Sequence, residues 1–600
     1  MKEYQERYIA NIKRVNQLKD VYSQADEGFS VWYEGRLQAK KEMEILKKEN
    51  IDLLNKDLFP VLDSLYEADA QTLQDLQDFA DALMDWKTNL DCGIYVLIHE
   101  SLLSMYRVRK DRNKIIQELY KLGMGLYYRN RMFQGSQTEL AKKIYFENEM
   151  VFTEGGSYLK YFDRIDDEET KGYIIRSLAN ISISTTDRKR RIATTAKVIN
   201  IVSDPYYREM APSLPWDAYL RKTYQQMSAN RSTLSDGGLS KEELSSIMEA
   251  CQIIFEPEKE NKDPNIRWLW PFYEMEYSCG FTDLKTTLSR MEKLIESTPY
   301  DRYDESGLYG NVQLPIYYGR LLQNNPQYTK EKNIRFLKYA YDKMMKALLS
   351  FPREKIDDFY FYDIALLVFS YYETEGVDTY HDVISRLIGR IFPQNYIRMK
   401  KAGEIASLFA AKIYENDPSH FDDISFIKEI KDPKEKEDVL LNYVKDCGLY
   451  YDFGLTSMNM KKITDIRDLF EQESEIFTLH TQFGYDNLGT RESTKRFADI
   501  ARGHHRWYDQ SDGYPKDYIR IESPYRRICD LFAICDHILF EYHGDMDKLT
   551  KEMKEKSGTR FSPLALSYLD EELSAKIEKV LTLEKEEYYR ELYDLISSIH

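Results

Sequence analysis

The chain has 600 residues, of which 42% are apolar and 31% are charged, and its formal net charge is −17. This composition is typical of a folded globular protein, and the length exceeds what one hydrophobic core serves, so several domains are expected. The acidic charge argues against a DNA partner and against binding to anionic membranes. The longest apolar run, around Ile364 to Tyr372, is too short to span a bilayer, so no membrane insertion is expected.

Two further properties of the sequence bear on compartment and fold class. The first residues lack the apolar core of a secretion signal, and the six cysteines are scattered without zinc-site spacing, which predicts a cytoplasmic protein with reduced thiols. Glycine and proline are both scarce, at 26 and 17 residues, while apolar residues recur with helical periodicity. The sequence therefore predicts an all-α fold.

The N-terminal two thirds of the chain is predicted to be a succession of helices. Residues 1–50 are charged and favour a long exposed helix or a short coiled coil, and residues 51–210 continue with helical periodicity. The richest loop signals lie between Asp204 and Asp236, where three X-Pro pairs and an Asp-Gly-Gly sequence occur. They separate this region from a second helical region at 235–390.

The second helical region resembles a helical repeat in texture. A capping box at Ser240–Glu243 marks one helix start, and three apolar-periodic segments follow at spacings that suit paired helices: Ile316–Asn324, Glu331–Leu349 and Tyr360–Glu373. The pattern resembles a tetratricopeptide-like α-solenoid, whose concave face would bind a protein partner. An irregular helical bundle without a groove accounts for the same pattern, so both interpretations stay open.

The last predicted domain, residues 395–600, begins after a boundary near Phe392-Pro393. Inside it, Asp432-Pro433 offers an N-cap and a first-turn proline for a new helix. Five of the nine histidines fall in one stretch of this domain: His480, His504, His505, His537 and His543. Because imidazole is a common ligand of transition metals, this concentration predicts a metal site.

The histidine pair is the most specific part of this stretch. The helix that leads into it places Phe497, Ile500 and Ala501 on the same side as His504. The pair is followed by Gly513-Tyr514-Pro515, and Asp530 then stands among apolar residues. Burial disfavours a lone carboxylate, so Asp530 is expected to have a cation as its partner.

Residues 395–575 resemble the HD-GYP domain, a branch of the HD superfamily of metal-dependent phosphohydrolases. The matching elements are, in chain order, Tyr451-Asp452-Phe453-Gly454 in the place of the HD motif, His480, His504-His505, Gly513-Tyr514-Pro515, Asp530 and Gly558-Thr559-Arg560-Phe561-Ser562-Pro563. Members of this family are all-helical and hydrolyse cyclic di-GMP, a bacterial second messenger, with two or three iron, manganese or similar ions. The resemblance implies a divergent HD-GYP domain in a cyclic di-GMP signalling protein.

The resemblance also implies roles for individual residues. Asp452 would be the catalytic carboxylate and would bridge metal ions, and the other metal ligands would be His480, His504, His505 and Asp530. Tyr514 and Pro515 would shape the loop that admits the nucleotide. Three arginines are candidates for phosphate contacts, with a solvated helix face as the alternative: Arg520, Arg526 and Arg527.

Three positions depart from the family pattern. The histidine of the HD pair is Tyr451, whose phenol, with an ordinary pKa of about 10, is a poor ligand for most divalent ions. The lysine expected after the glycine is Leu455, and the acid that often follows the histidine pair is Arg506. The entering helix, residues 396–413, has no histidine that would replace the lost ligand.

Three hypotheses for the function follow from the retained and the lost positions. The site holds one or two divalent ions, iron or manganese, and hydrolyses cyclic di-GMP if it is active. Alternatively, the domain is catalytically inactive and serves as a regulatory scaffold that binds a nucleotide or a protein. A third hypothesis makes the whole chain chiefly an interaction module, because helices fill most of its length.

Overall fold

The computed structural model describes residues 2–21, 28–85, 89–131, 133, 138–234, 238–328, 330–350, 388–389, 393–458, 461–490, 492–583 and 585–597. Helices dominate these residues, and the bridges between extended residues among them are isolated ones. The all-α prediction is therefore confirmed. None of the described helices is long and apolar enough to cross a membrane. The predicted helix at 360–373 lies outside the described residues.

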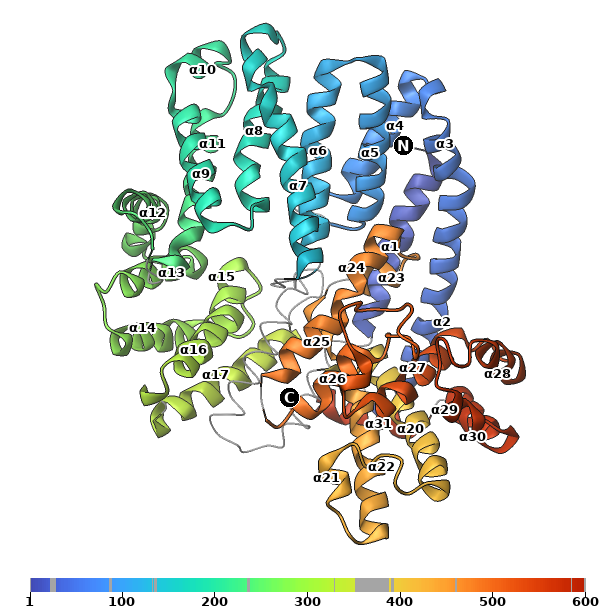
Figure 1. Ribbon diagram of the computed structural model, residues 1–600. Coiled ribbons are helices and arrows are strands. Elements are labelled where there is room, and N and C mark those ends of the chain that lie inside the picture. Colours follow the sequence, from blue (N-terminus) through green and yellow to red (C-terminus); the bar gives the residue numbers. More distant parts are fainter. Residues whose placement is uncertain are drawn as a thin grey trace. The chain divides into compact units, whose positions relative to one another are not determined.

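The chain divides into two compact units, whose elements are labelled in Figure 1. Unit 1 consists of Met1–Leu18, Lys41–Tyr360 and Lys462–Phe470. Unit 2 consists of Lys19–Lys40, Phe361–Lys461 and Glu471–His600. The units alternate along the sequence, and the four predicted regions stay a prediction.

The first fifty residues, predicted as a long exposed helix or a short coiled coil, contain two helices. Two ion pairs, of 2.7 and 2.6 Å, join α1 (Glu3–Val21) in antiparallel order to the second half of α2 (Phe29–Leu53): Arg7–Glu49 and Arg14–Glu42. On α1, Tyr8, Ile12 and Val15 recur at helical spacing and are buried. The pairing and the buried face contradict the exposed single helix and leave the coiled-coil alternative open.

The remaining helices of unit 1 follow one another closely along the chain. They are η1 (Leu54–Leu58), α3 (Phe59–Asp63), η2 (Leu65–Glu67), α4 (Ala70–Leu83), α5 (Cys92–Arg109), α6 (Arg112–Asn130), α7 (Glu139–Ser157), η3 (Tyr158–Arg164), α8 (Glu168–Ser184), α9 (Arg188–Ser203), α10 (Pro205–Met210), α11 (Trp216–Ser228), η4 (Ala229–Thr233), α12 (Lys241–Phe255), η5 (Glu256–Glu260), α13 (Ile266–Ser278), α14 (Leu284–Ser297), α15 (Glu305–Leu308), η6 (Tyr309–Gln313), α16 (Leu314–Asn324), η7 (Pro326–Tyr328) and α17 (Glu331–Ser350). Neighbours along the chain pack together, and α8 also contacts α6 and α11. The tetratricopeptide-like repeat itself stays a prediction.

Local capping signals set the starts of these helices. An aspartate side chain accepts hydrogen bonds from free first-turn N–H groups at the N-terminus of many of them: Asp69, Asp91, Asp111, Asp167, Asp187 and Asp283. The predicted capping box of Ser240 and Glu243 is present at the start of α12. The helical starts are therefore readable from short stretches of sequence.

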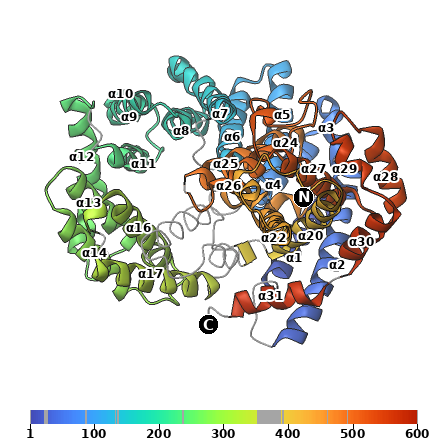
Figure 2. The ribbon, with the colours of Figure 1, turned by 60° about the horizontal axis from the view of Figure 1, so that its bottom comes forward.

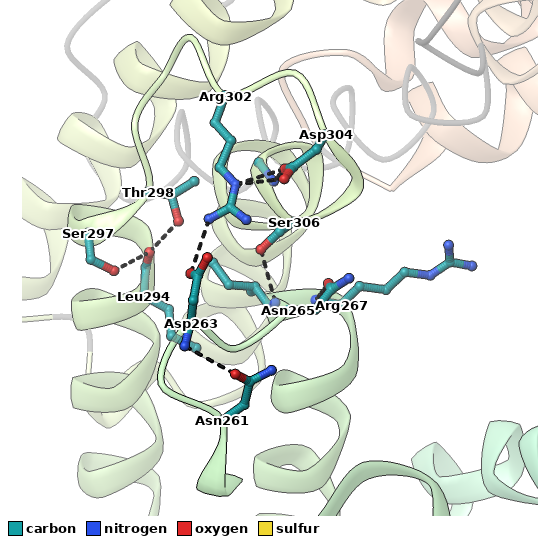
Figure 3. A network of polar contacts seen from close by, with 12 residues as sticks. Asn261, Asp263, Asn265, Arg267, Leu294, Ser297, Thr298, Arg302, Asp304 and Ser306 are labelled. Carbon is teal, nitrogen blue, oxygen red and sulfur yellow. Dashed lines mark hydrogen bonds and ion pairs between the residues drawn. The ribbon is translucent and has the colours of Figure 1, made fainter. Parts of the chain in front are cut away.

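A polar network joins two of the turns in unit 1 (Figure 3). The Arg302 guanidinium donates a hydrogen bond to Asp304 at 2.8 Å and lies 3.8 Å from Asp263. The backbone N–H of Ile266 donates to the Ser306 hydroxyl at 3.1 Å. These contacts tie the turn before α13 to the turn before α15, so the intervening helix α14 is held between fixed ends.

Unit 2 carries the predicted site. Its helices are α20 (Pro393–Asn416), α21 (Ser425–Lys428), α22 (Pro433–Tyr450), η9 (Phe453–Ser457), α24 (Glu471–Phe477), α25 (Leu479–Gly489), α26 (Lys495–Gly503), η10 (Arg520–Glu522), α27 (Arg526–Glu541), α28 (Met546–Glu555), α29 (Pro563–Ser567), α30 (Glu571–Thr582) and α31 (Glu586–Ser597), while α23 (Lys461–Thr464) leads into the last segment of unit 1. Helix α20 packs against α22 and α27, and α26 packs against α22, α25 and α27. The predicted apolar face of α22 is buried, as expected: Leu440, Tyr443, Val444 and Cys447.

Candidate metal centre

Four of the predicted ligands come together in unit 2. One ligand atom from each of them lies within 4.8 Å of the other three: Asp452, His480, His504 and His505. The Asp452 carboxylate lies 3.6 Å from Nε2 of His480 and 3.5 Å from Nε2 of His504. The two Nε2 atoms are 3.5 Å apart. This convergence of one carboxylate and three imidazoles is a set of donors that suits a divalent transition metal.

Close packing of three elements brings these ligands together. Asp452 follows α22 directly, and Gly454 of η9 lies so close to α25 that a Cβ there would collide with the carbonyl of His480. The Tyr450 ring, at the end of α22, stacks on Phe497 of α26 with centroids 4.1 Å apart. Because α26 ends at the histidine pair, this stack fixes the distance between that pair and Asp452.

Backbone carbonyls orient two of the imidazoles. Nδ1 of His480 lies 2.6 Å from the carbonyl of Phe477, and Nδ1 of His504 lies 3.1 Å from the carbonyls of Ile500 and Ala501. A carbonyl only accepts hydrogen bonds, so Nδ1 must carry the proton and the Nε2 lone pair faces Asp452. This is the tautomer that a metal ligand needs.

The ionisation states of the cluster also suit a metal. Burial lowers the pKa of His480 to about 4, so its ring is neutral at pH 7. Burial opposes ionisation of Asp452, but the adjacent His504 ring and the charge of Arg398 lower the pKa of its carboxyl below the ordinary value. The cluster therefore offers an anionic oxygen from Asp452 and a neutral ring nitrogen from His480.

An ion pair that the sequence did not predict lies beside His505. Nδ1 of His505 is 3.8 Å from a carboxylate oxygen of Asp536 on α27, and Asp536 pairs with Arg398 of α20 at 2.5 Å. Arg398 thus places a permanent positive charge next to the cluster. Asp536 could have been found, since it stands among apolar residues of the same helix as Asp530, but Arg398 carried no local signal.

The structure does not bring Asp530, predicted as a metal ligand, to the cluster. Its carboxylate pairs with Arg520, so the expected cationic partner is present but it is an arginine. Arg520, predicted to contact substrate phosphates, is buried, and it also donates to the carbonyl of Tyr508 at 2.9 Å. Arg526 and Arg527 both face Asp423. All three arginines thus face acids of the protein itself, and Arg526 and Arg527 share one of them. Their contact with phosphates stays a prediction.

Arg506, the departure next to the histidine pair, organises the loop that follows. Its guanidinium donates to the carbonyls of Gln510, Asp512 and Gly513 at 2.6, 3.0 and 3.4 Å. Gly513 has a φ of +78°, and a Cβ there would collide with the carbonyl of His505. The loop therefore folds back onto the histidine pair, and the hydrogen bonds from Arg506 to the loop carbonyls stabilise this conformation.

This loop sets Tyr514 beside the cluster. The Tyr514 ring lies 4.6 Å from the His505 ring and 6.0 Å from the His480 ring, between centroids, and Pro515 follows through a cis peptide bond. The closing Gly558–Pro563 segment meets the same loop, since the N–H of Tyr508 donates to the carbonyl of Arg560 at 3.1 Å. The loop after the histidine pair and the closing segment, which are separate motifs in the sequence, are thus in contact in the structure.

Arg560 is a half-buried cation that was not among the arginines predicted to contact phosphates. Burial lowers the pKa of its guanidinium, and the carboxylate of Asp536 partly offsets that effect, so Arg560 lies within electrostatic reach of the cluster. Among the described residues, no carboxylate lies within ion-pair distance of Arg560. It is therefore better suited to contact an anionic ligand than Arg520 or Arg527.

Tyr451, at the position of the lost histidine, points its ring toward the site. The ring is fully buried and lies 5.1 Å from the His504 ring and 5.2 Å from Phe532, between centroids. Its hydroxyl makes no hydrogen bond of acceptable geometry among the described residues. Burial and the nearby Asp452 carboxylate raise its pKa well above the ordinary value, so the phenol stays protonated and is a poor metal ligand.

The Tyr451→Phe variant is expected to raise the free energy of unfolding by about 1 kcal/mol, because it removes a buried hydroxyl without a partner. Its metal content should equal that of the wild type. The matched control is Tyr443→Phe, which removes a hydroxyl that donates to the Arg496 carbonyl at 2.6 Å and should lower stability by about 1 kcal/mol. Chemical denaturation and metal analysis measure both effects, and metal loss in Tyr451→Phe would identify the phenol as a ligand.

No family model matches the chain, and no curated protein shows significant similarity to it. Membership of the HD-GYP family therefore stays a prediction that rests on the motifs. The four side chains could hold a metal ion, because one donor atom of each lies within 4.8 Å of the others and backbone carbonyls orient two of the imidazoles.

Proposed function

We propose that unit 2 contains a divergent HD-GYP domain that binds a single iron or manganese ion and hydrolyses a phosphodiester of the cyclic di-GMP type. The observation that carries this proposal is the convergence of Asp452, His480, His504 and His505 within 4.8 Å. The chemistry that such an ion supplies is Lewis acidity toward the phosphodiester and activation of water.

A single ion, rather than two or three, follows from the surroundings of the cluster. The second acid near it, Asp536, is already neutralised by Arg398, and Asp530 is neutralised by Arg520. At the position of the lost histidine stands the protonated phenol of Tyr451. A second divalent ion would have to compete with Arg398 for the carboxylate of Asp536.

The residues around the cluster suit an anionic ligand. Arg560 is free to contact a phosphate oxygen, and Arg398 adds positive charge to the same side. The Tyr514 ring beside His505 offers an aromatic surface for a nucleobase. In a chain of net charge −17, local cations are needed to attract a nucleotide.

A second candidate function is binding of the same nucleotide without hydrolysis. The observation that favours it is that Tyr451 stands in place of the family's histidine and Leu455 in place of its lysine. Leu455 is 4% exposed and thus occupies a hydrophobic position, where a phosphate-contacting lysine is expected from the family pattern. A domain of this kind would serve as a regulatory scaffold.

The two candidates separate in one experiment on anaerobically purified protein. We expect close to one metal ion per chain and turnover of cyclic di-GMP after addition of manganese or ferrous iron. Metal with nucleotide binding but no turnover would favour the scaffold, and absence of both metal and turnover would reject the enzyme. The Tyr451→His variant should raise turnover if the site is eroded, and it is measured alone before Leu455→Lys is added, because a lysine at that buried position also destabilises the fold.

A further inference from the structure

Unit 1 contains a cluster of two cations and three tyrosines on helices α6, α8 and α11, which we name the tyrosine–cation cluster: Tyr120, Tyr173, Arg176, Tyr219 and Lys222. Helix α8 contacts both α6 and α11, and the three helices succeed one another in Figure 2. Tyr173 and Arg176 lie three residues apart on α8. Tyr219 and Lys222 lie three residues apart on α11, so each of these two pairs shares one face of its helix. The cluster therefore crosses three helices on neighbouring faces.

Two cation–ring contacts and one hydrogen bond hold Arg176 at the centre of this cluster. Its guanidinium lies 4.2 Å from the ring centroid of Tyr173 and 4.8 Å from that of Tyr120, and it donates to the carbonyl of Gly172 at 3.2 Å. A Cβ at Gly172 would lie 3.2 Å from the Tyr219 hydroxyl and 3.8 Å from Nη2 of Arg176. The hydroxyl from α11 and the guanidinium from α8 thus converge on the same glycine.

The two cations of the cluster lack acidic partners. Among the residues that the structure describes, no carboxylate lies within ion-pair distance of Arg176 or Lys222. Glu169 accepts a hydrogen bond from the Tyr173 hydroxyl of the cluster at 3.1 Å. Other arginines of unit 1 are paired, as Arg231 is with Glu274 at 2.7 Å.

Two neighbouring half-buried cations without acidic partners destabilise the protein when no ligand is bound. Burial lowers the pKa of Lys222, and the charge of Arg176 lowers it further. Like charges in a partly desolvated place repel each other more strongly than they do in water. An anion between them would remove this cost, and among the described residues Glu169 contacts Tyr173 without forming an ion pair with either cation.

The same helices carry further polar atoms without partners. Asn180, four residues after Arg176 on α8, has a buried side-chain oxygen with no hydrogen-bond partner in the described structure. Gln226, four residues after Lys222 on α11, has a buried side-chain nitrogen that also lacks one. Four residues are about one helical turn, so these amides extend the polar strip on the same two faces. Buried polar atoms normally have partners, which makes both of them candidates for ligand contacts.

We propose that the tyrosine–cation cluster is a binding site for a small anionic ligand, whose carboxylate or phosphate group lies between Arg176 and Lys222. The tyrosine rings would contact the remainder of the ligand, and the amides of Asn180 and Gln226 would bind its polar groups. This site is separate from the metal centre, belongs to unit 1 and does not depend on the proposed phosphodiesterase activity. It gives the helical region a small-molecule ligand where the sequence predicts a protein partner.

Thermal unfolding of the full chain tests this site, with sodium phosphate and sodium succinate as probes at constant ionic strength set by sodium chloride. At least one probe should raise Tm in a saturable way, and the better probe identifies phosphate or carboxylate as the preferred group. In Lys222→Gln the midpoint concentration of that probe should rise about tenfold or more, because one of two charged partners is gone. Without any probe, Lys222→Gln should raise Tm, since it removes the repulsion with Arg176.

The matched control is Lys197→Gln, which removes an exposed lysine of α9 that has no ion pair among the described residues. Its Tm and its response to both probes should equal those of the wild type. The proposal is rejected if neither probe gives a saturable shift beyond that of chloride, or if Lys222→Gln responds as the wild type does. A metal-free preparation run in parallel distinguishes this site from the metal centre, because only anion binding at the latter requires metal.

Discussion

Replacing His504 with alanine is expected to lower the affinity of the chain for manganese or ferrous iron more than about 100-fold, since the loss of even an outer-shell partner of a metal ligand costs 10–100-fold. Any hydrolysis of cyclic di-GMP should disappear with the metal. The physical reason is that Nε2 of His504 lies within 3.5 Å of both the Asp452 carboxylate and Nε2 of His480, at the centre of the donor set. Isothermal titration of metal-stripped protein measures the change.

The control for this variant is His543→Ala. His543 lies beyond the end of α27, is exposed and is not a member of the cluster, so its removal should leave metal affinity and stability unchanged. Circular dichroism verifies that His504→Ala is still folded. Equal metal affinity in both variants would show that the four converging side chains do not form a metal site, and the proposed function would fall with it.

The centre of the site could be predicted from the sequence, whereas its surroundings could not. Asp452, His480 and the histidine pair were found because their types and order follow a known motif. Asp530 and Asp536 are a different case, since both stand among apolar residues on α27. A helix turns by about 100° per residue, so side chains six residues apart point about 120° away from each other. Only the position of Arg398, 138 residues earlier in the chain, identifies Asp536 as the acid beside the histidines.

The same contrast between local and distant signals applies to the fold. Capping residues predicted helix starts such as those of α12 and α22, because a cap acts within one turn. The assignment of residues 462–470 to unit 1 depends on contacts with residues almost 400 positions earlier, for which the sequence carries no pattern. This segment is short and is flanked on both sides by unit 2.

The contact that fixes this segment is a buried ion pair in unit 1. Arg467, 1% exposed, donates from Nε and Nη2 to the two oxygens of Asp91, each at 2.7 Å. Asp91 also accepts hydrogen bonds from the Tyr8 hydroxyl at 2.8 Å and from two N–H groups at the start of α5. The Asp91 carboxylate thus accepts hydrogen bonds from a guanidinium, a phenol and a helix N-terminus, and both of its oxygens are fully hydrogen-bonded.

The Asp91→Asn variant is therefore expected to lower the free energy of unfolding by about 3–5 kcal/mol, because it removes the carboxylate charge from the buried ion pair with Arg467. Asparagine caps helices as well as aspartate does, so the loss reports the ion pair rather than the cap. The matched control is Asp69→Asn, at the exposed cap of α4, which should change stability by less than about 0.5 kcal/mol. Denaturation of both variants gives the comparison, and the double variant Asp91→Asn with Arg467→Met should recover part of the loss, because no unpaired charge remains. Equal stabilities of the two single variants would mean that Arg467 is solvated, and that the segment between Asp452 and His480 is not held by this pair.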